Sequence, residues 1–190
     1  MILISIAMEN CTILKQACPF TSKGYKAYEE IKFVVRQKIY RLLEEKYDLV
    51  KQVIPINSTT DEGQGFIYTS KDLKKFKSVI LTVHGSGKVR AGQWSRELIV
   101  TESLKSGSQV DYIKKSQELG LGVILLNTNQ DKDSIRGKPI FCNKTPLDHF
   151  FYTWKYFLLK SGIKNVAVVA HSDGGDVVMR AAMSISNFTQ

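Results

Sequence analysis

Six residues at 170–175 have the types and spacing of a catalytic serine turn. They read Ala-His-Ser-Asp-Gly-Gly and lie between an apolar run and a helical pattern. This is the context of a G-x-S-x-G turn, with Ala170 in place of the first glycine. Small residues at Ala170 and Gly174 let strand, turn and helix pack closely, while strained backbone exposes the hydroxyl of Ser172. The pattern predicts Ser172 as a candidate nucleophile.

A glycine-containing loop earlier in the chain is placed to support that serine. It follows an apolar run and consists of His84, Gly85, Ser86 and Gly87. In an acyl-transfer site the backbone N–H of Asp173 would donate to an oxyanion, together with an N–H of such a loop. We expect the glycines to allow close backbone approach. We expect His84 to brace the loop by hydrogen bonds, with action as a base as the alternative.

A nucleophilic serine also needs a base and a group that orients the base. In this type of site both partners follow the serine along the chain, yet no histidine follows Ser172. The later acids, Asp173 and Asp176, lie in the turn itself and in the predicted helix behind it. His149 lies far upstream, and His171 is expected to point away from the site. The residues present therefore predict an incomplete triad.

Aromatic, amide and basic side chains gather just after the glycine loop. They are Arg90, Gln93, Trp94 and Arg96. In one interpretation these side chains shape a pocket over the loop. In the other, Trp94 and Leu98 cap the edge of the sheet while both arginines stay solvated. The sequence leaves both interpretations open.

Three apolar, β-branched runs alternate with helical patterns and must position these residues. The strands are expected at 78–84, 122–127 and 165–170, and the helices at 110–119, 146–160 and 177–183. This alternation predicts right-handed crossovers and an α/β fold, namely an α/β-hydrolase-like parallel sheet with helices on both faces. Two weaker strands are expected near 53–56 and 66–69.

The remaining segments define the expected domain organisation. Residues 1–23 show no clear period and are expected to form a tail or a poorly ordered leader. Residues 24–190 are expected to form one domain, which begins with an amphipathic helix at 25–47. The apolar stripe of that helix covers the core or, alternatively, binds a partner. The polar stretch 128–145 is expected to be a surface loop and a candidate lid.

Charge and composition limit the classes of partner. The chain of 190 residues is 43% hydrophobic, enough for one core, and carries a formal net charge of +9. Its basic residues are scattered, and the densest cluster comprises Lys71, Lys74, Lys75 and Lys77. We interpret this cluster as a solvated turn, with a nucleic-acid patch as the alternative.

Cysteine spacing and hydropathy exclude further classes. Cys11, Cys18 and Cys142 are odd in number and include no CxxC pair, so neither a disulfide framework nor a metal site is expected. No apolar run approaches the roughly 18 to 20 residues that span a bilayer, so no membrane segment is expected. No motif indicates a cofactor.

Four segments together resemble the Argonaute-binding (Arb) domain family. They are 84–99, which contains an Arg-Ala-Gly-Gln-Trp block, 106–109, 122–127 and 169–175. The resemblance extends over residues 25–187. In it, the serine turn of the family corresponds to Ser172 and its glycine loop to the loop that begins at His84. The C-terminal third of the family pattern is absent, so we expect an incomplete domain that is truncated at its C-terminal end.

The resemblance implies an α/β-hydrolase-like domain used in nuclear gene regulation. Animal members of the family are called cotranscriptional regulators, and related domains are appended to fungal histone deacetylases. The implied partners are Argonaute proteins or chromatin and splicing proteins, in heterochromatin silencing or alternative splicing. The implied location is the nucleus, with the cytoplasm as a second one. We expect a regulatory interaction domain without catalysis, and the alternative is a serine esterase or acyl hydrolase with Ser172 as nucleophile.

Overall fold

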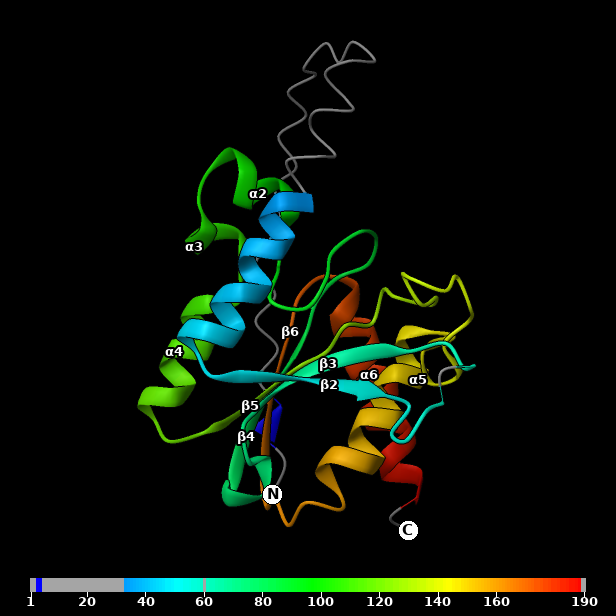
Figure 1. The fold of residues 1–190 in the computed structure, drawn as a ribbon. Helices are drawn as coiled ribbons and strands as arrows, with labels where there is room; N and C mark the ends of the chain where they lie inside the picture. The colour runs from blue at the N-terminus through cyan, green and yellow to red at the C-terminus, as the bar shows by residue number, and fades with distance from the viewer. Residues whose placement is uncertain (1–2, 5–32, 60, 189–190) are drawn as a thin grey trace.

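A mixed six-stranded β-sheet organises the part of the chain that the computed structural model describes, residues 3–4, 33–59 and 61–188. Its strands are β1 (Leu3–Ile4), β2 (Leu49–Ile54), β3 (Gly65–Ser70), β4 (Ser78–Val83), β5 (Gly122–Leu125) and β6 (Asn165–Ala170). They lie in the order β1-β6-β4-β5-β3-β2. Figure 1 labels the α-helices α2 (Arg96–Thr101), α3 (Leu104–Gly107), α4 (Val110–Glu118), α5 (Pro146–Thr153) and α6 (Asp173–Phe188).

The three strong apolar runs form the parallel centre of the sheet, as predicted. The central strand β4 pairs in parallel with β5 on one side and with β6 on the other. Leu81 and Ile124 are fully buried. Both faces of these strands are covered, which explains their continuous apolar sequence. The predicted helices between them are present as α4, as α5 continued by the π-helical turn η4 (Trp154–Leu158), and as α6.

The prediction of a purely parallel sheet is wrong at the edge formed by β2 and β3. β2 pairs antiparallel with β3, and β3 pairs antiparallel with β5. Residues 55–64 connect β2 to β3. A connection this short reverses the chain but cannot carry a parallel crossover, which needs a dozen or more residues. The sequence patterns identified β3 well, and they placed β2 too late along the chain.

The N-terminal helix is described from residue 33. Residues 33–41 are α-helical and continue as the π-helical turn η1 (Leu42–Lys46). Ile39 and Leu43 on its apolar stripe are fully buried, so in the described part the stripe covers the core. Of the tail predicted at 1–23, Leu3–Ile4 pair in parallel with β6. The other residues of that tail, and the beginning of the predicted helix, lie outside the described residues.

Two hydrophobic cores, one on each face of the sheet, hold these helices in place. Successive residues of β4 face opposite cores: Leu81 belongs to one and Ile80 to the other. The Leu81 core includes Phe150 of α5 and Val178 of α6. The Ile80 core includes Leu43 of the N-terminal helix, together with α4. Within the described part of the chain, none of the helices combines the length and apolar character that crossing a membrane requires.

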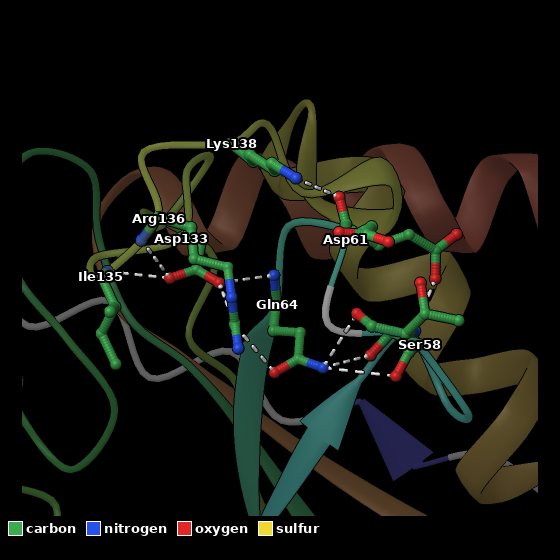
Figure 2. A network of polar contacts seen from close by, with 9 residues as sticks. Ser58, Asp61, Gln64, Asp133, Ile135, Arg136 and Lys138 are labelled. Carbon is green, nitrogen blue, oxygen red and sulfur yellow. Dashed lines mark hydrogen bonds and ion pairs between the residues drawn. The ribbon is translucent and has the colours of Figure 1, made fainter.

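The polar stretch 128–145 is a surface loop, as predicted, with residues 131, 132 and 134–139 exposed, and its buried Asp133 tethers it, while its role as a lid stays a prediction. Asp133 is buried, and its carboxylate accepts hydrogen bonds from the backbone N–H groups of Ile135 (2.8 Å), Arg136 (3.0 Å) and Gln64 (3.1 Å). Figure 2 shows this network. The hydrogen bond from the Arg136 backbone and those that join it hold the pKa of Asp133 well below its usual range. The polar side chains therefore attach the loop to the β2–β3 connection.

Candidate functional site

Ser172 stands in the sharp turn that links β6 to α6. Its backbone has a φ of 55°, a left-handed conformation that costs energy for a residue with a side chain. Hydrogen bonds from Gly174 N to His171 O (3.0 Å) and from Gly175 N to Ser172 O (2.8 Å) close the turn. Ser172 is exposed. The turn therefore has the strained backbone and the accessible serine that its sequence suggests.

Close backbone packing explains the glycines of the two loops. A Cβ atom at Gly174 would lie 2.5 Å from Val83 O and 2.7 Å from His84 O, so a side chain would push the backbone apart. A Cβ atom at Gly85 would lie 3.0 Å from the Cβ of Ser172. The loops meet because β4 and β6 are neighbouring parallel strands, whose carboxyl ends share one edge of the sheet. The glycine loop thus lies directly against the serine turn.

The remaining predicted donors lie around the same edge. Asp173 is the first residue of α6, where backbone N–H groups have no partner within the helix. Ser86 and Gly87 are exposed at the tip of the glycine loop. Gly87 has a φ of 83°, which favours glycine. These residues and Ser172 therefore follow the carboxyl ends of β4 and β6, which are neighbouring strands.

His84 lies beneath the glycine loop and not at the surface of the site. It is only 1% exposed, and its Nδ1 donates to Gly85 O over 2.9 Å. Burial lowers the pKa of His84 to about 4, so its ring is neutral at physiological pH. Asn129, which sequence reasoning missed, donates from Nδ2 to Gly85 O (2.8 Å) and to Val89 O (3.2 Å). His84 and Asn129 together hold the loop in shape.

His149 is a second buried, neutral histidine. It lies on α5, is fully buried, and accepts a hydrogen bond at Nε2 from Asn127 N (3.2 Å). Burial lowers its pKa to about 3, with a smaller contribution from His84. Among the described residues, neither a histidine nor a carboxylate is hydrogen-bonded to the hydroxyl of Ser172. Both histidines instead bond to backbone groups of the loops that follow β4 and β5.

Buried amide side chains form the layer below the site. Asn127, directly after β5, accepts at Oδ1 from Ala91 N (3.2 Å) and donates at Nδ2 to Gln130 Oε1 (2.8 Å). Asn143 donates to Asn127 O (3.2 Å) and to Gln130 O (2.5 Å). The only sequence signal for this layer is Asn127 at the end of a buried strand. The layer joins the loop after β5 to the segment that contains Ala91.

A cavity of about 320 Å³ opens beside the serine turn, between β6 and the helices α2 to α4. Trp94 forms its wall, with ring centroids 5.6 Å from Tyr112 and 5.9 Å from His171. Leu98 contributes apolar surface, and Lys105 lies at the lining as a cation. His171 therefore faces this cavity. An aromatic wall with a few polar groups suits a small ligand or one side chain of a partner.

Of the four side chains that gather after the glycine loop, Arg90, Gln93, Trp94 and Arg96, only Trp94 lines this cavity. Gln93 is fully buried: its Oε1 accepts from Arg90 N (3.2 Å) and its backbone O accepts from Gln109 Nε2 (3.1 Å). The Arg90 guanidinium turns back onto its own segment and donates to Val89 O (2.9 Å). Both side chains therefore bond to local backbone groups, and a role for them in a pocket over the loop stays a prediction. The described residues contain no cluster of histidine, cysteine and acidic side chains that could hold a metal ion.

Comparison with known proteins identifies the family. The model of the Arb2 domain matches residues 19–132. A FAM172 family protein homolog of Caenorhabditis elegans is 36% identical to this chain, over 85% of the chain and 51% of the relative. The cotranscriptional regulator ARB2A homolog of Gallus gallus is 32% identical over 79% and 48%, and human ARB2A is 31% identical over the same shares. The chain spans about half the length of these relatives. It belongs to the Arb2 domain family.

Proposed function

We propose that this chain is a regulatory interaction domain of nuclear gene regulation, in which an α/β-hydrolase-like fold serves as a scaffold without catalysis. Residues 24–190 form the domain in this proposal. Argonaute proteins, or chromatin and splicing proteins, are its partners. The relatives named cotranscriptional regulators support the regulatory role and the nuclear location. The family resemblance of the glycine loop and serine turn supports the class of partner.

The topology supports the hydrolase-like scaffold. Along the chain, the sheet grows from β4 to β5 in one direction and then crosses to β6 on the other side of β4. Such a reversal opens a crevice at the carboxyl ends of the strands, where α/β proteins bind ligands. Ser172 lies in this crevice, in a strand–turn–helix unit of the nucleophile-elbow type.

The observation that carries the proposal is an exposed, strained serine whose hydroxyl has no histidine or carboxylate hydrogen-bond partner among the described residues. The two histidines of the layer below, His84 and His149, are buried, neutral and engaged with backbone groups. An unassisted serine hydroxyl is a weak nucleophile. The cavity lined by Trp94 and Leu98 then provides the contact surface for a partner beside the turn.

The proposal is tested by substituting the serine and the cavity lining separately in cells that express the protein. We would replace the gene with Ser172→Ala, with the cavity variant Leu98→Lys, and with Lys132→Gln as a surface control. The readouts are co-precipitation with Argonaute and the ratio of splice isoforms. We expect Leu98→Lys to lose both readouts, while Ser172→Ala and Lys132→Gln retain them. Loss with Ser172→Ala alone would favour chemistry at the serine, and retention by all variants would exclude the cavity as the partner site.

A serine esterase or acyl hydrolase is the second candidate. It is favoured by the approach of the glycine loop, because a Cβ atom at Gly85 would lie 3.4 Å from the Ser172 Oγ. Backbone N–H groups of such a closely approaching loop and of the start of α6 would supply the donors of an oxyanion hole in this candidate. In this candidate the base and the acid come from residues outside the 190-residue chain. Labelling of the corresponding serine by a fluorophosphonate in a longer relative would distinguish it.

A further inference from the structure

Two lysine-rich segments that are far apart in sequence meet at the amino end of the parallel strands. The first is the connection between β3 and β4, residues 71–77, which carries four lysines. The second, residues 155–164, runs from η4 into β6 and carries three. Lys164 N and Asn165 N both donate to Lys77 O, over 2.8 and 3.2 Å. Both connections lie at the lower end of the sheet in Figure 1.

The lysines of this surface are exposed, and most have no ion-pair partner among the described residues. The set comprises Lys71, Lys74, Lys75, Lys77, Lys155, Lys160 and Lys164, which we call the amino-end lysine surface. Asp72 is the sole acid in the two segments, and it pairs with Lys75 at 2.8 Å. Lys74, Lys77 and Lys164 have no ion-pair partner among the described residues. Lys114 and Lys115 differ, since both pair with Glu118.

An aromatic side chain lies within the same surface. The Lys155 and Lys160 ammonium groups lie 5.3 and 4.7 Å from the ring centroid of Tyr156. The ring of Tyr152 lies 4.5 Å from that of Tyr156. Lysines that flank an aromatic ring are the combination with which proteins bind single-stranded nucleic acids, through phosphate contacts and base stacking.

We propose that the amino-end lysine surface binds single-stranded nucleic acid. The lysines contact phosphates across the two segments, and Lys155 and Lys160 leave the Tyr156 ring for phosphates so that a base can contact the ring. Unpaired, exposed ammonium groups favour a polyanion because binding releases condensed counterions from it. The surface lies at the end of the sheet opposite Ser172, so this inference does not depend on the function proposed for the serine turn.

The test is fluorescence anisotropy with the 190-residue chain and labelled oligouridylate or oligothymidylate of about 20 nucleotides. We expect affinity to fall steeply with salt, because each phosphate contact contributes about −0.7 to the slope of log K against log salt for single strands. The variant Lys74→Gln, Lys77→Gln, Lys164→Gln should bind at least tenfold more weakly, with a slope shallower by about 2. The matched control Lys38→Gln, Lys51→Gln, Lys132→Gln should change affinity less than about twofold.

A second variant tests the aromatic contribution. Tyr156→Leu should weaken single-strand binding about fivefold or more and leave duplex binding unchanged. Circular dichroism of every variant checks that the fold is retained. Equal weakening by the two lysine triples, or binding that salt does not affect, would overturn the proposal. Displacement of the oligonucleotide by polyglutamate at a lower concentration than by unlabelled oligonucleotide would also overturn it, because the surface would then prefer an acidic protein segment.

Discussion

The two ends of the parallel strands differ in whether their polar side chains are buried or exposed. At the carboxyl end, His84 and His149 are buried and neutral, and the backbone at Ser172 is strained. At the amino end, seven lysines are exposed on the two connections. Asp72, with a φ of 53°, is the one non-glycine residue of these connections with a left-handed backbone. The polar residues of the carboxyl end therefore contribute to folding stability. The charged side chains of the amino end are exposed and can contact a partner. Five substitutions or conditions test this difference, from the largest expected effect to the smallest.

Acid should destabilise the protein through the buried histidines of the carboxyl end. Their folded-state pKa values, about 4 for His84 and about 3 for His149, lie below the ordinary value of 6.5. The unfolded chain therefore takes up protons first as pH falls through 6.5, and stability that is complete above this pH is lost toward pH 4. Between about pH 7 and pH 5 we expect a loss of about 2 kcal/mol for each histidine, measured by urea unfolding.

The substitution His149→Gln sharpens this test. The side-chain oxygen of the glutamine can still accept the hydrogen bond from Asn127 N, but the glutamine does not titrate. The pH dependence of the free energy of unfolding should then fall by about half. An unchanged pH dependence would mean that His149 does not lie in the buried environment described above.

Gly174→Ala should give the next largest effect. Its Cβ would lie 2.5 Å from Val83 O, so the serine turn or β4 must shift, at a cost of about 3 kcal/mol in the free energy of unfolding. Gly175→Ala is the matched control, because nothing lies within 4 Å of its Cβ. The control should be neutral or stabilising by up to about 1 kcal/mol, since alanine is the better helix former. Equal effects of the two would contradict the close packing of the turn.

Ser172→Gly should stabilise the protein slightly. Glycine adopts the φ of 55° without the penalty that serine carries, and this relief is about 1 kcal/mol. Part of the gain is offset because glycine makes the unfolded chain more flexible. Thermal unfolding should therefore show a small rise in Tm. A clear decrease would mean that the turn is not strained at this position.

The amino-end lysines should leave stability almost unchanged. The triple variant Lys74→Gln, Lys77→Gln, Lys164→Gln removes exposed charges without ion-pair partners among the described residues. The free energy of unfolding should change by less than about 0.5 kcal/mol. A larger loss, measured by the same urea titration, would show that these side chains stabilise the fold and would remove the contrast with the carboxyl end.

The sequence predicted the features that depend on contiguous residues. The strands 78–84, 122–127 and 165–170 and the serine turn were identifiable because apolar periodicity and small residues lie next to one another in the chain. The antiparallel β2–β3 edge was missed, because its weak alternation does not reveal strand direction. The meeting of 71–77 with 155–164 was also missed, since it arises from strand order.

The side-chain environment of the site was less predictable than its backbone. Gln93 and Arg90 resemble pocket residues by type, yet they satisfy backbone groups that the fold would otherwise leave unpaired. Asn127 and Asn143 have no motif, because a buried amide is selected by the backbone groups that surround it. The polar composition of 128–145 predicts a surface loop, but it does not reveal that Asp133 is buried and anchors the loop by hydrogen bonds.

Reactivity of Ser172 toward a fluorophosphonate tests the central claim most directly, because labelling requires an activated serine. The purified 190-residue chain, its Ser172→Ala variant and a longer relative of the family would be treated side by side, with a serine esterase as the reactive control. With His84 and His149 buried and neutral, we predict that neither form of the chain and no corresponding serine of the relative is labelled, while the esterase is labelled fully. Labelling of the chain that disappears in Ser172→Ala would contradict the account and would establish a catalytic serine.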